Sequence, residues 1–208
     1  ATWPQQGFSL VTDGEAGLAL FNRGLPEIEA VPHGGRGTAL KLTLLRCVGW
    51  LSRDDFPTRR HSNAGPTLHT PGAQCLGRHR FRYAVLPFSG DHMEAGVVGH
   101  SLRYRTPVLT KQGVRDGCVR GGIGLVEKES VRTRLTAVKR HRSRDTLVIR
   151  VCNMSPVAVE ERLTIGIECL RAWRTDLMES RLEEIPLEGR VIRLELGPHQ
   201  IETLEVEP

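Results

Sequence analysis

The residues most able to do chemistry lie together in one long polar segment, Ser52 to Gln74. Asp54 and Asp55 are adjacent carboxylates, with Arg53 before them and Arg59 shortly after. On a strand, neighbouring side chains point to opposite faces, so the two carboxylates would not form a facing acid–base pair there. In a loop, both can accept hydrogen bonds from a ligand hydroxyl while an arginine donates to it. The residues alone allow two interpretations, a surface ion-pair cluster or a loop that binds a sugar or an anion.

Other candidate motifs lack a feature that their chemistry requires. Gly99-His100-Ser101-Leu102-Arg103 is without the final glycine of a nucleophile elbow, and Gly121-Gly122-Ile123-Gly124 is without the lysine of a phosphate loop. Four histidines lie close together, but their spacing matches no zinc motif. They are His61, His69, His79 and His92. The sequence therefore predicts neither a metal site nor a catalytic residue in this chain.

Length, charge and hydropathy restrict the class of protein. A chain of 208 residues corresponds to one large domain or two small ones. Its 29 basic residues are interleaved with 24 acidic ones, and the arginine-rich stretch 132–144 contains no aromatic residue, so we expect no nucleic-acid partner. No apolar run approaches the ~18 residues of a membrane span, so we expect no membrane partner. The sequence does not begin with Met, and we expect a processed chain or a piece of a longer one.

Hydrophobic residues that alternate with polar ones predict an all-β fold. Each alternating set is typical of a half-buried strand with one face inward and one face in solvent. The sets are Leu40, Leu42 and Leu44; Phe81, Tyr83 and Val85; Leu147, Ile149 and Val151; Leu163, Ile165 and Ile167; Ile192, Leu194 and Leu196; and Leu204 with Val206. The segment from Leu170 to Ile185 fits a short helix or two irregular strands, and we favour strand and loop. Short strands without helices between them favour antiparallel β-sandwiches.

A turn-rich stretch at residues 111–124 predicts a domain boundary. We therefore divide the chain into two domains, residues 1–117 and residues 118–208. The second part carries about five strand signals, which suits a small sandwich. In the first part, the segment from Ser52 to Gln74 is long for a loop, and loops of that length are usually functional or form an interface.

The cysteines are odd in number and form no C-x-x-C pair, which argues against a zinc ribbon or a redox motif. They are Cys47, Cys75, Cys118, Cys152 and Cys169. Because several of them stand in apolar stretches, we expect buried free thiols in a reducing compartment.

Four stretches carry a family resemblance. They are residues 13–27 (DGEAGLALFNRGLPE); residues 42–55 (LTLLRCVGWLSRDD), running on to 64–66 (AGP) and 70–75 (TPGAQC); residues 135–139 (LTAVK) with 149–153 (IRVCN); and residues 176–179 (DLME) with 197–204 (GPHQIETL). In order and spacing they resemble the C-terminal region of glycoside hydrolase family 38, the α-mannosidases, from about residue 10 to the end. The second stretch is the most specific. The match is to the bacterial, cytosolic-type branch, which implies a cytoplasmic location.

The resemblance implies a fold and a partner. Family members consist of an N-terminal α/β barrel, a small helical bundle, a large β supersandwich like that of galactose mutarotase, and a terminal β-sandwich. Residues 1–117 would be the C-terminal part of the supersandwich, and residues 118–208 the smaller terminal β-sandwich. The nucleophile, the acid/base and a zinc ion belong to the barrel. The resemblance thus implies no catalytic residue and no cofactor in this chain, with the zinc in a catalytic barrel of the same polypeptide.

The resemblance also implies a substrate-side loop. In relatives, an Asp-Asp loop with a nearby arginine projects towards the active site of the barrel. The matching residues here are Arg53, Asp54 and Asp55 with Arg59, although Arg60 could take the arginine's place. The chain would then be the non-catalytic C-terminal fragment of a retaining, α-mannosidase-like glycosidase, inactive when isolated. The linkage stays open between a free oligosaccharide and a small α-mannoside such as mannosylglycerate.

The alternative from another class is an autonomous carbohydrate-binding β-sandwich. Such modules usually present aromatic platforms to sugar rings. Aromatic residues are few here, and Trp50 and Trp173 stand in apolar, strand-like contexts. We therefore expect both tryptophans to be structural, which weighs against this alternative.

Overall fold

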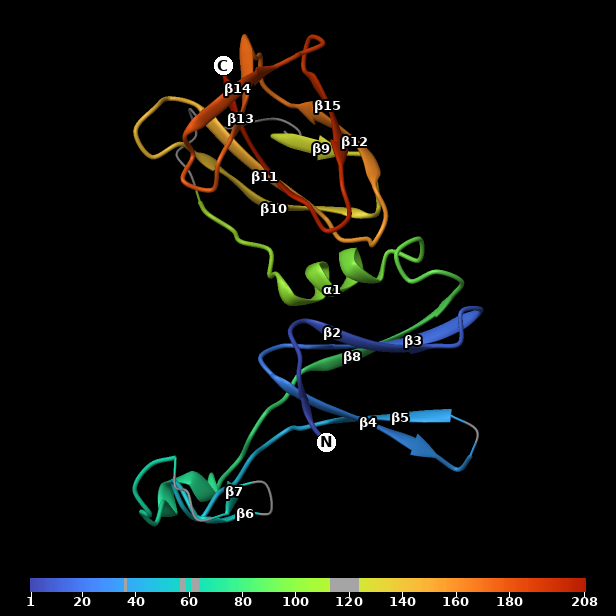
Figure 1. The fold of residues 1–208 in the computed structure, drawn as a ribbon, viewed down its shortest axis with the longest axis vertical. Coiled ribbons are helices and arrows are strands. Elements are labelled where there is room, and N and C mark those ends of the chain that lie inside the picture. The colour runs from blue at the N-terminus through green and yellow to red at the C-terminus, as the bar shows by residue number, and fades with distance from the viewer. Residues whose placement is uncertain (36, 57–58, 61–63, 113–123) are drawn as a thin grey trace. The chain divides into compact units, whose positions relative to one another are not determined.

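The computed structural model describes residues 1–35, 37–56, 59–60, 64–112 and 124–208, and of Phe56, Arg59 and Arg60 it describes the backbone alone. Within these residues β-strands dominate, accompanied by one 3₁₀ helix, η1 (Pro71–Gln74), and one α-helix, α1 (Val97–Arg105) (Figure 1). Every strand pair is antiparallel, so the predicted all-β antiparallel class is confirmed. Neither helix in the described part is long and apolar enough to cross a membrane.

The chain divides into two compact units, Ala1–Ser89 and Gly90–Pro208. The boundary that we predict between residues 117 and 118 falls within residues 113–123, which lie outside the described part of the chain. The domain limits 1–117 and 118–208 therefore stay a prediction.

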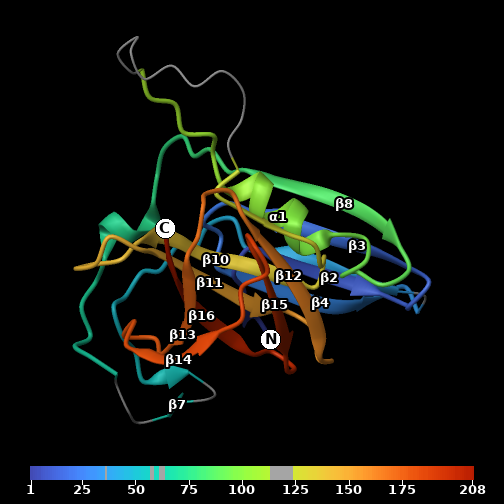
Figure 2. The same ribbon diagram turned by 90° about the horizontal axis from the view of Figure 1, so that it is seen from above.

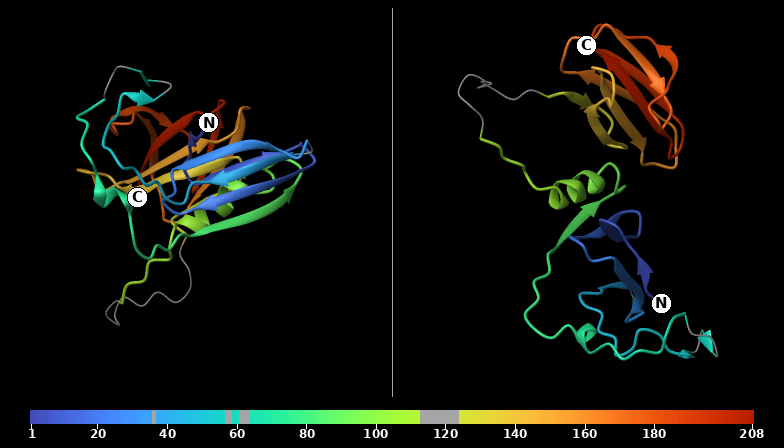
Figure 3. Two further views of the ribbon diagram at one scale, coloured as in Figure 1. Left: turned by 90° about the horizontal axis from the view of Figure 1, so that it is seen from below. Right: turned by 90° about the vertical axis from the view of Figure 1, so that its left-hand side faces the viewer.

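The first unit contains two small sheets and a separate hairpin. β2 (Phe8–Thr12), β3 (Ala16–Asn22) and β8 (Tyr83–Ser89) form one sheet in that order, and β1 (Trp3–Pro4), β4 (Glu27–His33) and β5 (Gly37–Leu42) form the other. β6 (Asp55–Phe56) pairs with β7 (Arg59–Arg60). Figure 3 shows this hairpin and η1 apart from the two sheets of their unit.

The core of the first unit is small and tightly fitted. Phe21 and Phe88 are buried, and the ring of Phe8 meets that of Phe21 edge to face at 6.5 Å. Gly17 lies opposite Phe88 in the register of β3 and β8. A Cβ atom at residue 17 would stand 2.2 Å from the Phe88 ring, so this position accepts only glycine.

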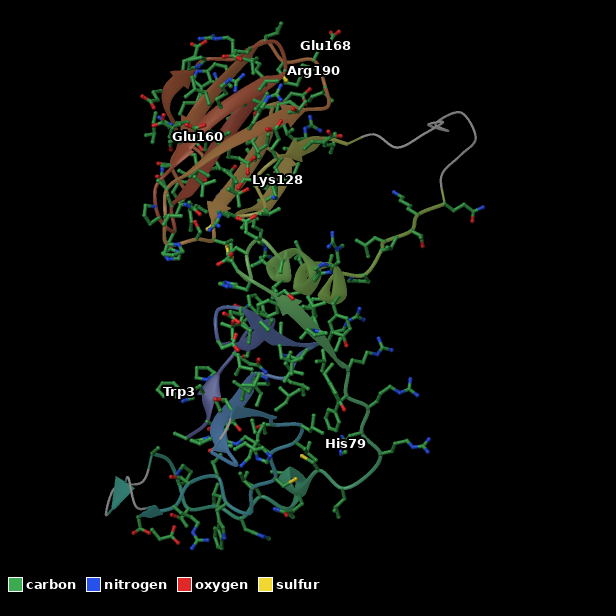
Figure 4. The ribbon with its side chains drawn as sticks, turned by 90° about the vertical axis from the view of Figure 1, so that its right-hand side faces the viewer. Trp3, His79, Lys128, Glu160, Glu168 and Arg190 are labelled. Carbon is green, nitrogen blue, oxygen red and sulfur yellow. The ribbon has the colours of Figure 1, made fainter. Side chains whose placement is uncertain are left out.

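Large hydrophobic side chains cover much of the surface of the first unit. Leu76 is 94% exposed and Trp3 is 66% exposed, and Figure 4 shows Trp3 at the edge of its sheet. On β8, Tyr83 and Val85 are exposed while Phe88 is buried. Exposed apolar surface of this extent is typical of an interaction site.

The second unit is a β-sandwich with its own continuous core. β10 (Thr133–Arg140), β11 (Leu147–Asn153), β16 (Ile201–Glu207), β13 (Arg171–Thr175) and β14 (Arg181–Ile185) form a five-stranded sheet in that order (Figure 2). β15 (Val191–Leu196), β12 (Val159–Ile165) and β9 (Val126–Lys128) form a three-stranded sheet. Both sheets contribute buried side chains to one cluster, among them Ile149, Val151, Leu204 and Val206 from the first sheet and Leu163, Ile165, Ile192 and Leu194 from the second.

The middle of the other face of the five-stranded sheet is buried as well. Leu204 and Val206 face the core, so Glu205 between them points away from it, in register with Val148 and Trp173. The side chain of Glu205 is nevertheless fully buried, as is that of Val148.

Two arginines make this burial of Glu205 possible. Arg144 donates to both carboxylate oxygens at 2.7 and 2.6 Å, and Arg181 and Thr146 donate to Oε1 at 2.8 and 2.9 Å. Arg181 also stacks on Trp173, with its guanidinium carbon 3.4 Å from the ring centroid. Burial by itself raises the pKa of the carboxyl, but the hydrogen bonds from these partners outweigh it and lower the pKa of Glu205 to about 2.

Most strands follow the predicted alternation, but β8 does not. β5 and β12 contain most of the expected residues, with Leu44 and Ile167 outside these strands. On β8, Tyr83 and Val85 are exposed and Phe88 is buried, so the inward face is the opposite of the predicted one. The preference for strand and loop between Leu170 and Ile185 is confirmed by β13 and β14.

The buried carboxylate makes stability pH-dependent in a predictable way. Its folded pKa is below the unfolded value, so its stabilisation is complete above about pH 4.5 and is lost as the pH falls towards about 2. We expect this one group to remove roughly 3 kcal/mol from the free energy of unfolding over that range. Glu205→Gln should be less stable at neutral pH and should lose this part of the pH dependence.

Urea titrations at several pH values would measure the free energy of unfolding. Trp173 serves as the fluorescence reporter in a chain that also carries Trp3→Phe and Trp50→Phe. Parallel loss of stability in the parent and the Glu205→Gln variant would contradict the assignment.

Candidate functional site

The polar segment from Ser52 to Gln74 is tied at its base to the residues that precede it. The amide of Leu51 donates to the carbonyl of Leu68 at 2.8 Å, and that of Thr70 donates to the carbonyl of Gly49 at 2.9 Å. The amide of Val48 donates to Ala73 at 3.3 Å. The residues on either side of the segment's tip thus run antiparallel, and their backbone groups satisfy one another.

Side chains reinforce this base. Gln74 donates from Nε2 to the carbonyl of Val48 at 2.8 Å, and the Thr70 hydroxyl donates to the same oxygen at 3.2 Å. Ser52 accepts from the amide of Ala64 at 3.1 Å, nearer the tip. We call residues 47–52 and 64–75 the loop base.

The predicted site residues stand at the tip beyond the loop base. Arg53 and Asp55 form an ion pair, and both side chains are about half exposed. Asp54 between them is exposed. The structure therefore contains the ion pair of the first interpretation, while leaving all three side chains accessible to a ligand.

The register of the hairpin shows which residue lies opposite each of the two arginines, Arg59 and Arg60. The Cα atom of Asp55 lies opposite that of Arg60, and Phe56 lies opposite Arg59. Arg60 is thus the direct cross-strand neighbour of Asp55. The assignment of Arg53, Asp54, Asp55 and Arg59 to a substrate site stays a prediction.

Trp50 differs from our expectation. It is 41% exposed, because it belongs to an isolated bridge with His69 instead of a buried strand. Its ring lies 5.4 Å from the imidazole of His69, and the Arg53 guanidinium lies 6.0 Å from its centroid. Trp173 is buried as expected.

The expectation of buried thiols is also wrong where it can be checked. Cys47 is exposed, and Cys75, Cys152 and Cys169 are half-buried. Cys47 and Cys75 belong to the loop base, where apolar neighbours in the sequence are not packed in a sheet. Cys118 lies outside the described residues.

The charged side chains of the second unit do not extend the predicted site. A cavity of about 530 Å³ in that unit is lined by residues that include Glu161, Arg162, Arg174 and Arg193. Glu161 accepts hydrogen bonds from the amides of Glu129 and Ser130, so its buried carboxylate has a structural role. Across the described residues, no three His, Cys, Asp or Glu side chains are grouped to hold a metal ion.

The loop base is the part of this region that the sequence did not predict. Gln74 and Thr70 carry its side-chain hydrogen bonds, yet neither follows a periodic pattern. The only signal was the Gly- and Pro-punctuated composition of the segment, which indicated a loop without indicating its closure.

Comparisons with known proteins find similarity to one family. Residues 133–204 match the sequence model described as "Glycosyl hydrolases family 38 C-terminal beta sandwich domain". A "Putative mannosylglycerate hydrolase" of Halalkalibacterium halodurans is 28% identical over 201 residues, which are 94% of this chain and 20% of the relative. "Alpha-mannosidase 2C1" of Mus musculus is 25% identical over 133 residues, 62% of this chain and 13% of the relative. The chain thus spans one fifth or less of these relatives.

Two solved structures from Enterococcus faecalis have the same fold. One is an alpha-mannosidase, with a TM-score of 0.74, and the other a protein in the glycosyl hydrolase family 38, with a TM-score of 0.75. Each is 24% identical, and the match covers all of this chain and 21% and 23% of the two structures. With the family match, they confirm the resemblance and the fold expected from it.

The loop base should be a local unit of stability. Gln74→Met removes the amide donor while keeping the side-chain length, and loss of one hydrogen bond costs about 1 kcal/mol. We expect amide hydrogen exchange of Leu51 and Thr70 to become about five- to tenfold faster, whereas exchange of the core amide of Asn153 should not change. Equal acceleration at all three amides, measured by NMR, would mean that Gln74 stabilises the whole chain and not the loop base.

Proposed function

We propose that this chain is the non-catalytic C-terminal region of a retaining α-mannoside hydrolase, because residues 133–204 match the C-terminal β-sandwich domain of glycoside hydrolase family 38. In this proposal its two units support a catalytic barrel of the same polypeptide. The tip of the segment from Ser52 to Gln74 contributes to the substrate side of the active site. The family match over residues 133–204 carries the proposal.

The surface of the first unit supports the scaffolding role. Trp3, Leu76, Tyr83 and Val85 are exposed hydrophobic side chains, and the buried core of the first unit is smaller than that of the second. Apolar surface of this kind becomes stable when another domain covers it. A neighbouring part of the same polypeptide would do so.

The chemistry of the loop tip supports the substrate-side role. Carboxylates such as those of Asp54 and Asp55 accept hydrogen bonds from sugar hydroxyls, and a guanidinium offers a planar pair of donors. Mannosylglycerate, the substrate in the name of the Halalkalibacterium halodurans relative, carries a carboxylate, which arginine binds with two parallel hydrogen bonds. A small anionic α-mannoside therefore suits an arginine-containing tip.

Catalysis itself belongs elsewhere in this proposal. The described residues hold no group of side chains that fits a zinc ion. Hydrolysis with retention of the anomeric configuration requires two carboxyl groups about 5 Å apart on either side of the scissile bond. We assign that role to neither Asp54 nor Asp55. The zinc and the catalytic carboxylates would lie in the barrel. A cytoplasmic location stays a prediction.

One observation favours a second candidate function, an autonomous carbohydrate-binding module. Trp50 exposes part of its ring beside His69 and Arg53. Aromatic faces stack on sugar rings, and the isolated chain would then bind mannosides measurably. Titration of the chain with methyl α-mannoside, followed by tryptophan fluorescence, separates this candidate from the first.

The isolated chain should have no glycosidase activity. We expect no hydrolysis of an aryl α-mannoside at high protein concentration, with or without added zinc, and activity only in the whole polypeptide. Turnover by the chain alone would contradict the proposal if it survived repurification and disappeared in Asp54→Asn or Asp55→Asn.

In the whole polypeptide, loss of the substrate-side arginine should affect catalysis more than stability. Arg59→Ala should lower kcat/KM about ten- to a hundredfold, because a hydrogen bond to a charged group contributes ~1.5–3 kcal/mol. The melting temperature should hardly change if Arg59 acts on substrate, since a surface ion pair contributes well under ~1 kcal/mol to stability. Arg60→Ala, measured in parallel, shows which arginine acts.

Arg193→Ala is the control, because it removes an exposed arginine that pairs with Glu188 on the second unit. It should leave kcat/KM unchanged. If Arg59→Ala and Arg60→Ala both melt several degrees lower with the parent's kinetics, both arginines are structural and the predicted site is wrong.

A further inference from the structure

We propose that Cys47 and Cys75 are a redox-active pair, which a low-molecular-weight disulfide such as glutathione disulfide oxidises to a disulfide bond across the loop base. This modification site is independent of the proposed function. It rests on the positions of the two thiols and on the hydrogen bonds around them.

The two cysteines are brought together by the loop base. Cys47 Sγ lies 3.2 Å from the carbonyl oxygen of Gln74, the residue directly before Cys75. Because that oxygen is about 3 Å from the next Cα atom, Cys47 Sγ is within about 6 Å of the Cα atom of Cys75. Rotation about the Cα–Cβ bond of Cys47 moves its sulfur by up to about 3 Å. The pair is therefore within reach of disulfide geometry.

The backbone on both sides of the pair is held in place. The Val48 amide is bonded to Ala73, and the Gln74 side chain is bonded to Val48. Beyond the pair, Nε2 of His79 lies 2.6 Å from the carbonyl oxygen of Cys75. Figure 4 labels His79 and draws sulfur in yellow.

Cys75 itself has a strained backbone. It ends η1 with φ of 51°, in the left-handed region that non-glycine residues seldom adopt. A non-glycine residue keeps such a backbone conformation only where the surrounding structure holds it there. The loop base therefore holds the backbone of Cys75 in place, with its thiol 3.5 Å from the carbonyl oxygen of Ala73 in the reduced protein.

Accessibility selects Cys47 as the first thiol to react. Cys47 is exposed, whereas Cys75, Cys152 and Cys169 are half-buried. Burial raises the pKa of the Cys152 and Cys169 thiols, which lowers their thiolate fraction. Because the thiolate is the nucleophile in disulfide exchange, we expect Cys47 to react first.

The exchange proceeds in two balanced steps. The Cys47 thiolate attacks one sulfur of glutathione disulfide, forming a mixed disulfide and releasing one glutathione thiolate. The Cys75 thiolate then attacks the Cys47 sulfur, forming the protein disulfide and releasing the second glutathione thiolate. The protein loses two electrons and two protons, and one glutathione disulfide is reduced to two glutathione thiols.

The bond would close a ring that contains residues 48–74. This ring holds Arg53, Asp54 and Asp55 at its far end. Oxidation would thus replace the hydrogen bonds of the loop base by a covalent closure.

Peptide mapping of the complete chain tests the proposal. The folded chain is titrated with glutathione disulfide, quenched with acid and digested with trypsin without reduction. We expect a mass loss of about 2 Da, and residues 47–53 and 61–78 in one linked species that a reductant separates. The other cysteines fall in different peptides, residues 116–120, 151–162 and 163–171.

Cys75→Ser and urea provide the controls. In Cys75→Ser, the mixed disulfide on Cys47 should persist as an adduct of about 305 Da. In urea, where the loop base is lost, the rate of closure in the parent chain should fall at least about tenfold. The proposal is overturned if the folded parent keeps the adduct on Cys47, links either cysteine to a third one, or closes no faster than the unfolded chain.

Discussion

An antiparallel sheet with an apolar face must cover that face, and the two units meet this requirement to different degrees. In Gly90–Pro208, the five-stranded and three-stranded sheets bury their apolar faces against each other around residues such as Ile149 and Leu163. In Ala1–Ser89, two three-stranded sheets bury few side chains and leave Tyr83 and Val85 exposed. The second unit therefore has a much larger core of its own than the first.

Unpaired backbone groups impose a second constraint, on the long polar segment. A loop of this length would leave many amides and carbonyls to solvent, but at its base Leu51, Thr70 and Val48 donate to backbone partners across the loop. The base therefore has a fixed geometry from which Arg53 to Asp55 project. This is how a segment without long strands can hold its side chains in place.

The sequence predicted the strands better than it predicted their surroundings. Alternation has a period of two in any half-buried strand, so β11, β12 and β15 were recognisable from residues such as Ile149, Leu163 and Leu194. Burial outside strands follows from tertiary contacts, for which local composition is a poor guide. Cys47 and Trp50 have apolar neighbours in the sequence and are nevertheless exposed. The site residues at the tip were identified by family resemblance, and the loop base was not predicted, because hydrogen bonds between residues about twenty positions apart leave no periodic signal.

The burial of Glu205 has a practical consequence for protein engineering. On β16 the polarity of the residues is misleading, since Glu202 and Glu205 are buried while Ile201 is 54% exposed. Surface-entropy reduction for crystallisation replaces glutamates that are taken to be exposed, and on sequence alone it would select Glu205. That choice would remove the counter-ion of Arg144 and leave Arg181 with Glu207 alone. Leu182, on the edge strand β14, is exposed and open to replacement by a polar residue.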